Sequence, residues 1–138
     1  MKKLFKNAAI VLVLISFFAT SCEKEKVIAI LTPVGFTATY TPQGTNNPTV
    51  VKGDNVNVTT GTFIRIEPIL PDEWKKCKGK WTHTVEGAWT NDDYSCVKDA
   101  NTGVVNFIPK KKGPFKIKFT YTCPDGSSTS ATITIIVT

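Results

Sequence analysis

The sequence predicts an all-β domain, built as a two-sheet sandwich of about seven or eight short strands. Three observations lead to this fold class. After residue 26, no window of helix length repeats its apolar residues every 3.6 positions. Short segments instead alternate between apolar and polar residues, as half-buried strands do. Stretches rich in Gly, Pro, Asn and Asp separate these segments, as turns do.

In the first half of the domain, β-branched and apolar residues mark the expected strands. These strands cover 27–31, 36–40, 50–58 and 63–67, and the third is divided by a turn at Gly53-Asp54. The stretch 42–48 is dense in Gly, Asn and Pro and is expected to be a loop. Pro68 and Pro71 are expected to close the fourth strand.

The strand expected at 80–85 places Trp81, His83 and Val85 on one face. Glu86-Gly87 follows it and predicts a tight hairpin turn, because Gly adopts the positive φ that such turns need. In this hairpin, the alternation of inward and outward residues places Trp89 on the outward face.

The end of the chain carries the clearest strand pattern. A short strand at 103–108 stops at Pro109, and 110–114 forms a turn. The strand at 115–122 has inward apolar residues against outward Lys and Thr; the inward set is Phe115, Ile117, Phe119 and Tyr121. A turn at 124–126 then leads to the last strand, 132–137.

Two stretches resemble Ig-like and PKD-like domains, and together they lie within residues 49–138. Val51-Lys52-Gly53-Asp54-Asn55-Val56 resembles the opening V-x-G-x-x-V of those domains. The stretch from Gly113 to the last strand resembles their final hairpin, and Trp81 stands where such folds bury an aromatic residue. The Trp-Asp-Phe-Gly-Asp-Gly run of PKD domains is missing, so the resemblance implies an Ig-like sandwich. Tyr121-Thr122-Cys123 imitates the Tyr-x-Cys of antibody domains, but near the end of its strand, and we treat it as coincidence.

The first 21 residues are expected to be a cleaved signal peptide. Lys2, Lys3 and Lys6 form a positive start, and 8–19 is an apolar stretch interrupted by Ser16. A membrane-spanning helix needs about 20 apolar residues, which this run does not reach. The alternative is a retained N-terminal anchor helix.

The cleavage site resembles the lipobox of bacterial lipoproteins. Ala19-Thr20-Ser21 precede Cys22, and Ala19 at the place of the usual Leu is similar to the relaxed lipoboxes of Bacteroidota. The resemblance implies lipidation of Cys22 and anchoring in the outer membrane, on either its periplasmic or its cell-surface face, because more than one lipid chain anchors stably. A tether over 22–30 and a domain over 31–138 would follow. Ordinary secretion, with Cys22 in a disulfide, is the alternative.

Charge excludes one class of partner. The formal net charge of +6 includes three leader lysines, and the remaining chain has 14 Lys and Arg against 11 Asp and Glu. This small, dispersed excess provides no basic stripe, so nucleic acid is not expected as a partner. Lysines at turns and on outward strand positions are expected to prevent edge-to-edge association of sheets.

Three further cysteines predict one disulfide in an oxidising compartment. Cys77 and Cys123 share the inward parity of neighbouring strands, at the same end of the sandwich. Cys77 and Cys96 lie opposite each other if Glu86-Gly87 forms a hairpin. Both pairings stay open, and either would contribute about 2–4 kcal/mol to stability.

No residue group predicts catalysis, a metal site or a cofactor. His83 is the only histidine, and its parity predicts a packed, hydrogen-bonded residue at the edge of the core. Asn91-Asp92-Asp93 has oxygen ligands of the kind calcium takes, but it lacks the spacing of a calcium loop and is expected to be solvated.

The expected function is therefore non-enzymatic. We expect a membrane-anchored module that binds another envelope protein or helps assemble an envelope complex; small accessory lipoproteins of Bacteroidota secretion systems are of this size and kind. The alternative is a surface carbohydrate-binding lipoprotein that stacks a glycan on exposed aromatic residues. The candidate binding aromatics are Trp74, Trp89 and Tyr94.

Overall fold

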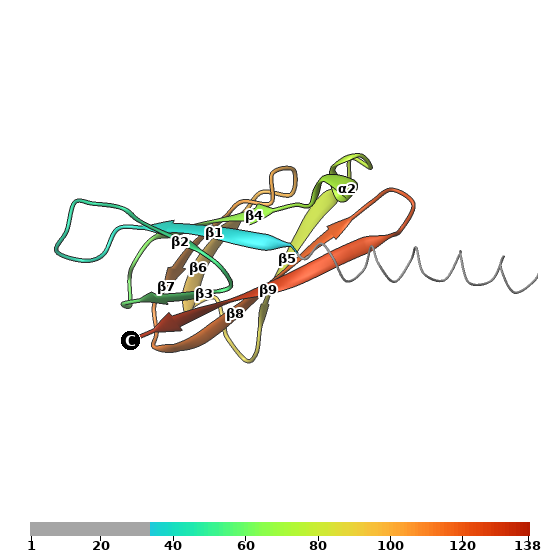
Figure 1. The fold of residues 1–138 in the computed structure, drawn as a ribbon. Helices are drawn as coiled ribbons and strands as arrows, with labels where there is room; N and C mark the ends of the chain where they lie inside the picture. The colour runs from blue at the N-terminus through green and yellow to red at the C-terminus, as the bar shows by residue number, and fades with distance from the viewer. Residues whose placement is uncertain (1–33) are drawn as a thin grey trace, which may run out of the picture. The chain divides into compact units, whose positions relative to one another are not determined.

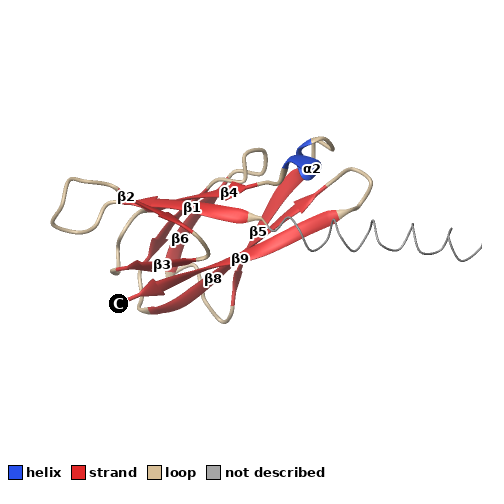
Figure 2. Cartoon of the chain, viewed as in Figure 1, coloured by secondary structure: helices blue, strands red, loops and turns tan. Residues whose placement is uncertain are grey.

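Nine strands and one short helix make up residues 34–138, the part of the chain that the computed structural model describes (Figures 1 and 2). The strands are β1 (Gly35–Tyr40), β2 (Thr49–Lys52), β3 (Asn55–Val58), β4 (Ile64–Ile69), β5 (Lys80–Glu86), β6 (Tyr94–Lys98), β7 (Val105–Pro109), β8 (Gly113–Thr122) and β9 (Ser128–Val137), and the helix is α2 (Asp72–Lys75). The expected signal peptide, lipidated Cys22, tether and strand at 27–31 lie outside the described residues.

The strands form two sheets, and the predicted all-β, two-sheet sandwich is confirmed. One sheet has five strands in the order β2-β1-β4-β7-β6, and the other has four in the order β3-β9-β8-β5. Neighbouring strands are antiparallel except β3 and β9, which run parallel. The ten-residue strands β8 and β9 form the longest hairpin, drawn in orange and red in Figure 1.

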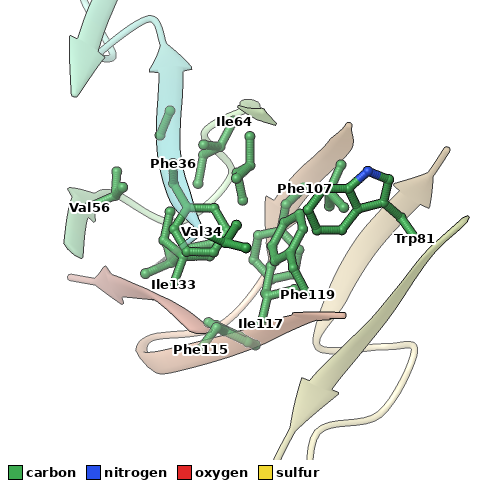
Figure 3. Close-up of a cluster of buried hydrophobic side chains, with 14 of the residues drawn as sticks. Val34, Phe36, Val56, Ile64, Trp81, Phe107, Phe115, Ile117, Phe119 and Ile133 are labelled. Atoms are coloured by element: carbon green, nitrogen blue, oxygen red, sulfur yellow. The ribbon is translucent and has the colours of Figure 1, made fainter. Parts of the chain in front are cut away.

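The core lies between the two sheets and takes side chains from both. Phe36, Ile64 and Phe107 face it from the five-stranded sheet, where none is more than 2 % exposed. Alternate residues of β8 face it from the other side, as the sequence predicts: Phe115, Ile117, Phe119 and Tyr121. Figure 3 shows Phe36, Ile64 and Phe107 together with Phe115, Ile117 and Phe119 in this core. Aromatic rings pack at an angle, as in Phe36 and Phe119, whose centroids are 4.9 Å apart.

The predicted hairpin at Glu86-Gly87 is wrong. β5 pairs with β8 in one sheet, and β6 pairs with β7 in the other, so the intervening chain crosses between the sheets. Gly87 does adopt the positive φ expected for it, 100°. Alternation within a strand shows which face is buried, but it does not identify the neighbouring strand.

β4 extends through Pro68, where the sequence predicted an end. Pro68 lies opposite Phe36 of β1, and the Phe36 carbonyl accepts a hydrogen bond from Gly53 on its other side, at 3.1 Å. The β7 ladder on the far side of β4 has already ended at Ile66 and Val105. No strand therefore needs the amide proton that proline lacks.

Candidate functional site

Trp89 and Tyr94 cap one end of the sandwich instead of standing out from it. The Trp89 ring stacks on Phe115 with centroids 4.1 Å apart, and Tyr94 stacks on Phe107 at 5.3 Å. Both rings are half-buried against the core. The expected outward parity of Trp89 is wrong because it assumed a hairpin between β5 and β6.

Trp74 lies at the opposite end. It belongs to α2, next to Cys77, and Cys77 is bonded to Cys123 just beyond the last residue of β8. Trp89 instead lies against Gly113 at the first residue of β8. A strand of ten residues spans roughly 30 Å, so the three candidate aromatics do not form one platform. All three are half-buried.

The disulfide joins Cys77 to Cys123, one of the two pairings expected from the sequence. Cys123 is buried at the end of β8, as its inward parity predicts. Cys96 is the free cysteine among the described residues, and it is half-buried on β6. Burial raises the pKa of the Cys96 thiol and outweighs the opposite effect of Lys98. The thiol is therefore held in its less nucleophilic form.

His83 is a packed, hydrogen-bonded residue at the edge of the core, and this prediction is confirmed. Its Nε2 lies 3.0 Å from the Gly103 carbonyl oxygen. The ring stacks near Trp81 and meets Phe119 edge-on, with centroids 4.8 Å apart. Burial holds the pKa of His83 below its ordinary value, since the charged ring would lose water contacts.

Asp93 organises a turn. Its Oδ2 accepts hydrogen bonds from the Thr90 amide at 2.7 Å and the Thr90 hydroxyl at 3.1 Å. Its Oδ1 pairs with Lys111 Nζ at 2.5 Å. The lysine and the two Thr90 donors hold the pKa of Asp93 below its usual range. Both carboxylate oxygens are thus used within the protein, in a side chain that is only 6 % exposed.

No three His, Cys, Asp or Glu side chains of residues 34–138 are grouped so that they could hold a metal ion. Over the same residues, no helix has the length and hydropathy needed to cross a membrane.

One indentation lies beside β4, where the β7 ladder has ended. Its volume is about 510 Å³. Glu67 and Lys75 supply charges to its rim, and Trp81 and Tyr121 form its floor. Each of these two aromatic residues is only 5 % exposed, so neither offers a ring face for stacking. The Tyr121 hydroxyl is also already bonded to the Gly79 amide, at 2.6 Å.

A second indentation of about 490 Å³ lies on the outer face of the five-stranded sheet. Thr102 lines both indentations. Glu67 of the first indentation also forms an ion pair with Arg65 of the second, at 2.9 Å. We refer to both together as the outer groove. Its most exposed apolar side chain is Val97 of β6, at 68 %.

Asn106 lines the second indentation of the outer groove. It is opposite Arg65 of β4 on one side and opposite Val97 of β6 on the other. Its Oδ1 atom is buried and has no hydrogen-bond partner. A buried acceptor without a donor costs free energy, so Asn106 is a locally unfavourable position in the sheet.

The 99–103 loop forms the wall between the two indentations. The Asp99 carboxylate accepts hydrogen bonds from the Asn101 and Thr102 amides, at 2.8 and 3.2 Å. Those donors hold the pKa of Asp99 below its usual range. On the core side, Ala100 accepts a bond from the Trp81 amide at 2.9 Å. The wall is therefore rigidly connected to β5.

Sequence reasoning did not identify Arg65, Asn106 or Val97. Each has the outward parity of its strand, which is the ordinary position of a solvated residue. Their adjacency depends on three strands pairing from separate parts of the chain. No protein-family model matches this chain, and no curated protein matches it in sequence.

Proposed function

We propose that the sandwich is of the Ig-like type. Support comes from the strand order, because β1-β4-β7-β6 corresponds to the A-B-E-D sheet of that fold, and β5-β8-β9 corresponds to C-F-G. Trp81 of β5 is buried, as is the tryptophan of the C strand in immunoglobulin domains. The disulfide departs from that pattern, since it joins the α2 segment to the end of β8 and not two facing strands.

We further propose that the chain is a lipid-anchored, non-enzymatic module of the bacterial outer membrane that binds another envelope protein. The lipobox-like sequence before Cys22 supports the anchor. The observation that carries the binding role is the outer groove, which is lined by the exposed Val97 and by the Arg65–Glu67 ion pair. Fold type alone would not identify this role.

The shape of the groove favours a protein over a glycan. A sugar site would need an exposed aromatic face, and the aromatic floor here is almost completely covered. An open surface that combines exposed apolar side chains, here Val97 and Ile69, with charged residues is instead typical of the polar interfaces of non-obligate protein complexes.

The test compares two substitutions of exposed aliphatic residues on opposite faces. Val97→Lys adds a charge to the outer groove, and the matched control Ile136→Lys adds one to the outer face of the four-stranded sheet, where Ile136 is 39 % exposed. Each variant is expressed in the bacterium that naturally makes the protein, crosslinked in the cell envelope and purified together with any bound proteins. We expect one stoichiometric envelope protein with the wild type and Ile136→Lys, and its loss with Val97→Lys. Equal recovery with both variants would overturn the assignment to the groove.

The anchor has a separate test. Metabolic labelling with a fatty-acid analogue should label the wild-type protein and not Cys22→Ala. Label on the Cys22→Ala protein, or none on the wild type, would refute lipidation and leave the groove experiment unaffected.

A further inference from the structure

One half of β9 has a free backbone edge. β3 pairs with β9 only from Thr134 to Val137, and β9 begins six residues earlier, at Ser128. Within residues 34–138, no strand pairs with the 128–133 stretch on that side. We call this stretch the open edge; it belongs to the red strand at the long hairpin of Figure 1.

The hydrogen-bond pattern shows which backbone groups face the open edge. The Thr134 amide donates to Asp54 at 2.7 Å and the Thr138 amide to Val58 at 3.0 Å, so even-numbered residues face β3. Bonds alternate sides along an antiparallel strand, and the Cys123 amide donates to Ser127 on the β8 side, at 2.8 Å. The amide and carbonyl groups of Ser128, Ser130 and Thr132 therefore point away from β8, toward no described strand.

Two other edges of the sandwich, those of β5 and β6, are better protected. On β5, the Trp81 amide donates a hydrogen bond to the Ala100 carbonyl at 2.9 Å. The His83 carbonyl accepts one from Lys98 Nζ at 3.0 Å. On β6, Lys98 has the parity of the core-facing residues, and an inward charge is a common guard on an edge strand. The open edge contains neither a charge nor a proline: its residues are Ser, Thr, Ser, Ala, Thr and Ile.

We propose that the open edge of β9 binds an extended strand of a partner protein, which continues the four-stranded sheet in line with β3. Main-chain hydrogen bonds to Ser128, Ser130 and Thr132 would give affinity, as in other cases of strand addition. This surface is distinct from the outer groove, so the inference goes beyond the function proposed above.

The side chains around the open edge specify the partner strand. On the inner side, Thr129 and Ala131 are small and half-buried, so apolar side chains of an added strand would continue this partly covered face. On the outer side, Lys118 lies opposite Thr132 in the neighbouring strand, and Lys116 lies opposite Thr134. Both lysines are exposed and lie beside short hydroxyl residues in the ladder. The fitting strand alternates apolar residues with acidic ones.

The probe is a short peptide in which valine and glutamate alternate, compared with the same peptide carrying lysine for glutamate. The test protein is the chain from residue 22 with Cys22→Ala, because both sheets and the core lie within residues 34–138. Amide hydrogen exchange, measured residue by residue, should slow at least tenfold at Ser130 and Thr132 when the glutamate peptide saturates the protein. The lysine peptide should bind at least tenfold more weakly.

Ser130→Pro is the discriminating variant. It removes an amide proton that points away from β8, so the β8 ladder is retained, and edge strands tolerate proline in this position. Ser130→Ala, which keeps the amide, is the matched control. We expect Ser130→Pro to weaken glutamate-peptide binding at least tenfold and Ser130→Ala to leave it unchanged.

Three results would overturn the proposal. The first is slow amide exchange at Ser130 and Thr132 before peptide is added, and the second is peptide-induced protection of β2 or β6 and not of the open edge. The third is equal affinity of Ser130→Pro and Ser130→Ala for the glutamate peptide. The exchange result in wild-type protein decides the matter even if Ser130→Pro does not fold. The Val97→Lys variant should bind the peptide as the wild type does. Failure of the open-edge proposal can therefore be distinguished from failure of the proposal that the outer groove binds an envelope protein.

Discussion

A single glycine determines how closely the 99–103 loop approaches the core. A Cβ atom added at Gly103 would lie 2.7 Å from Pro68 Cγ and 2.8 Å from the Trp81 ring. Gly103 also has a φ of 78°, in the left-handed region. The close approach and the positive φ both favour glycine at this position. Gly103 thereby positions the loop that forms the wall of the outer groove.

Gly103→Ala should therefore lower the free energy of unfolding by roughly 2–4 kcal/mol, since strain in the backbone adds to overpacking. Gly126→Ala is the control, because Gly126 has a similar φ of 91° but nothing within 4 Å of the added Cβ. It should cost only about 1–2 kcal/mol. Urea unfolding of both variants measures the difference, and equal losses would contradict the close approach.

His83 should make stability depend on pH near neutrality. Burial lowers its pKa in the folded protein, so the unfolded chain takes up a proton first, near pH 6.5. The free energy of unfolding should then fall as the pH drops through 6.5 toward the folded pKa. The lowered carboxylate pKa values of Asp99 and Asp125 act in a separate window, below about pH 4.

Urea unfolding of wild type and His83→Gln at several pH values between 7.5 and 5 checks this expectation. The wild type should lose stability relative to the variant across that interval. Parallel profiles would show that His83 titrates alike in both states.

At the scale of elements, two loops are joined by one carboxylate. Asp93 connects the chain before β6 to Lys111 in the turn between β7 and β8, and the Lys110 amide donates to the Asp93 carbonyl at 2.8 Å. The Asp93 side chain is 6 % exposed, so the carboxylate of this ion pair is sheltered from water, although Lys111 is 63 % exposed. The Asp72–Lys75 pair of α2 is similar in distance, 2.8 Å, but Asp72 is 93 % exposed.

Asp93→Asn should consequently destabilise the protein much more than Asp72→Asn, because exposed pairs contribute little. Thermal unfolding at pH 7 compares the two variants. Since the pKa of Asp93 is lowered in the folded state, its contribution should be present above pH 4 and disappear as the pH falls below that. A Tm decrease of equal size in both variants would contradict the structural role of Asp93.

Strand identity and inward faces could be predicted from the sequence, whereas strand partners could not. Alternation gave the buried face of β8 and the packed position of His83 correctly. It misplaced Trp89, because the same alternation fits a strand in either sheet. The start of β9 at Ser128 also escaped prediction, since its first residues are small and polar, and pairing with β8 extends the strand. The outer groove needs β4, β6 and β7 side by side, which no local pattern encodes.

At the scale of the whole molecule, the Cys77–Cys123 bond joins the α2 segment to the end of β8 over a sequence separation of 46. Removing it with Cys77→Ala and Cys123→Ala together should lower the free energy of unfolding by about 2–4 kcal/mol, since the unfolded chain gains freedom. Cys96→Ala should have a much smaller effect, because Cys96 is half-buried and forms no disulfide within residues 34–138. Denaturant titration distinguishes them, and comparable losses would contradict the assigned pairing.

The same bond has a mechanical consequence. If the domain is pulled apart between Val34 and Thr138, tension passes directly from Cys77 to Cys123 and bypasses the chain between them. That chain would contribute about 160 Å to a fully extended molecule at the usual reach per residue. With the bond intact, β5, β6, β7 and β8 all remain inside a closed loop that force at the ends cannot stretch. A tethered domain under load would thus lengthen only through β1 to β4 and β9, and its extension would have a fixed limit.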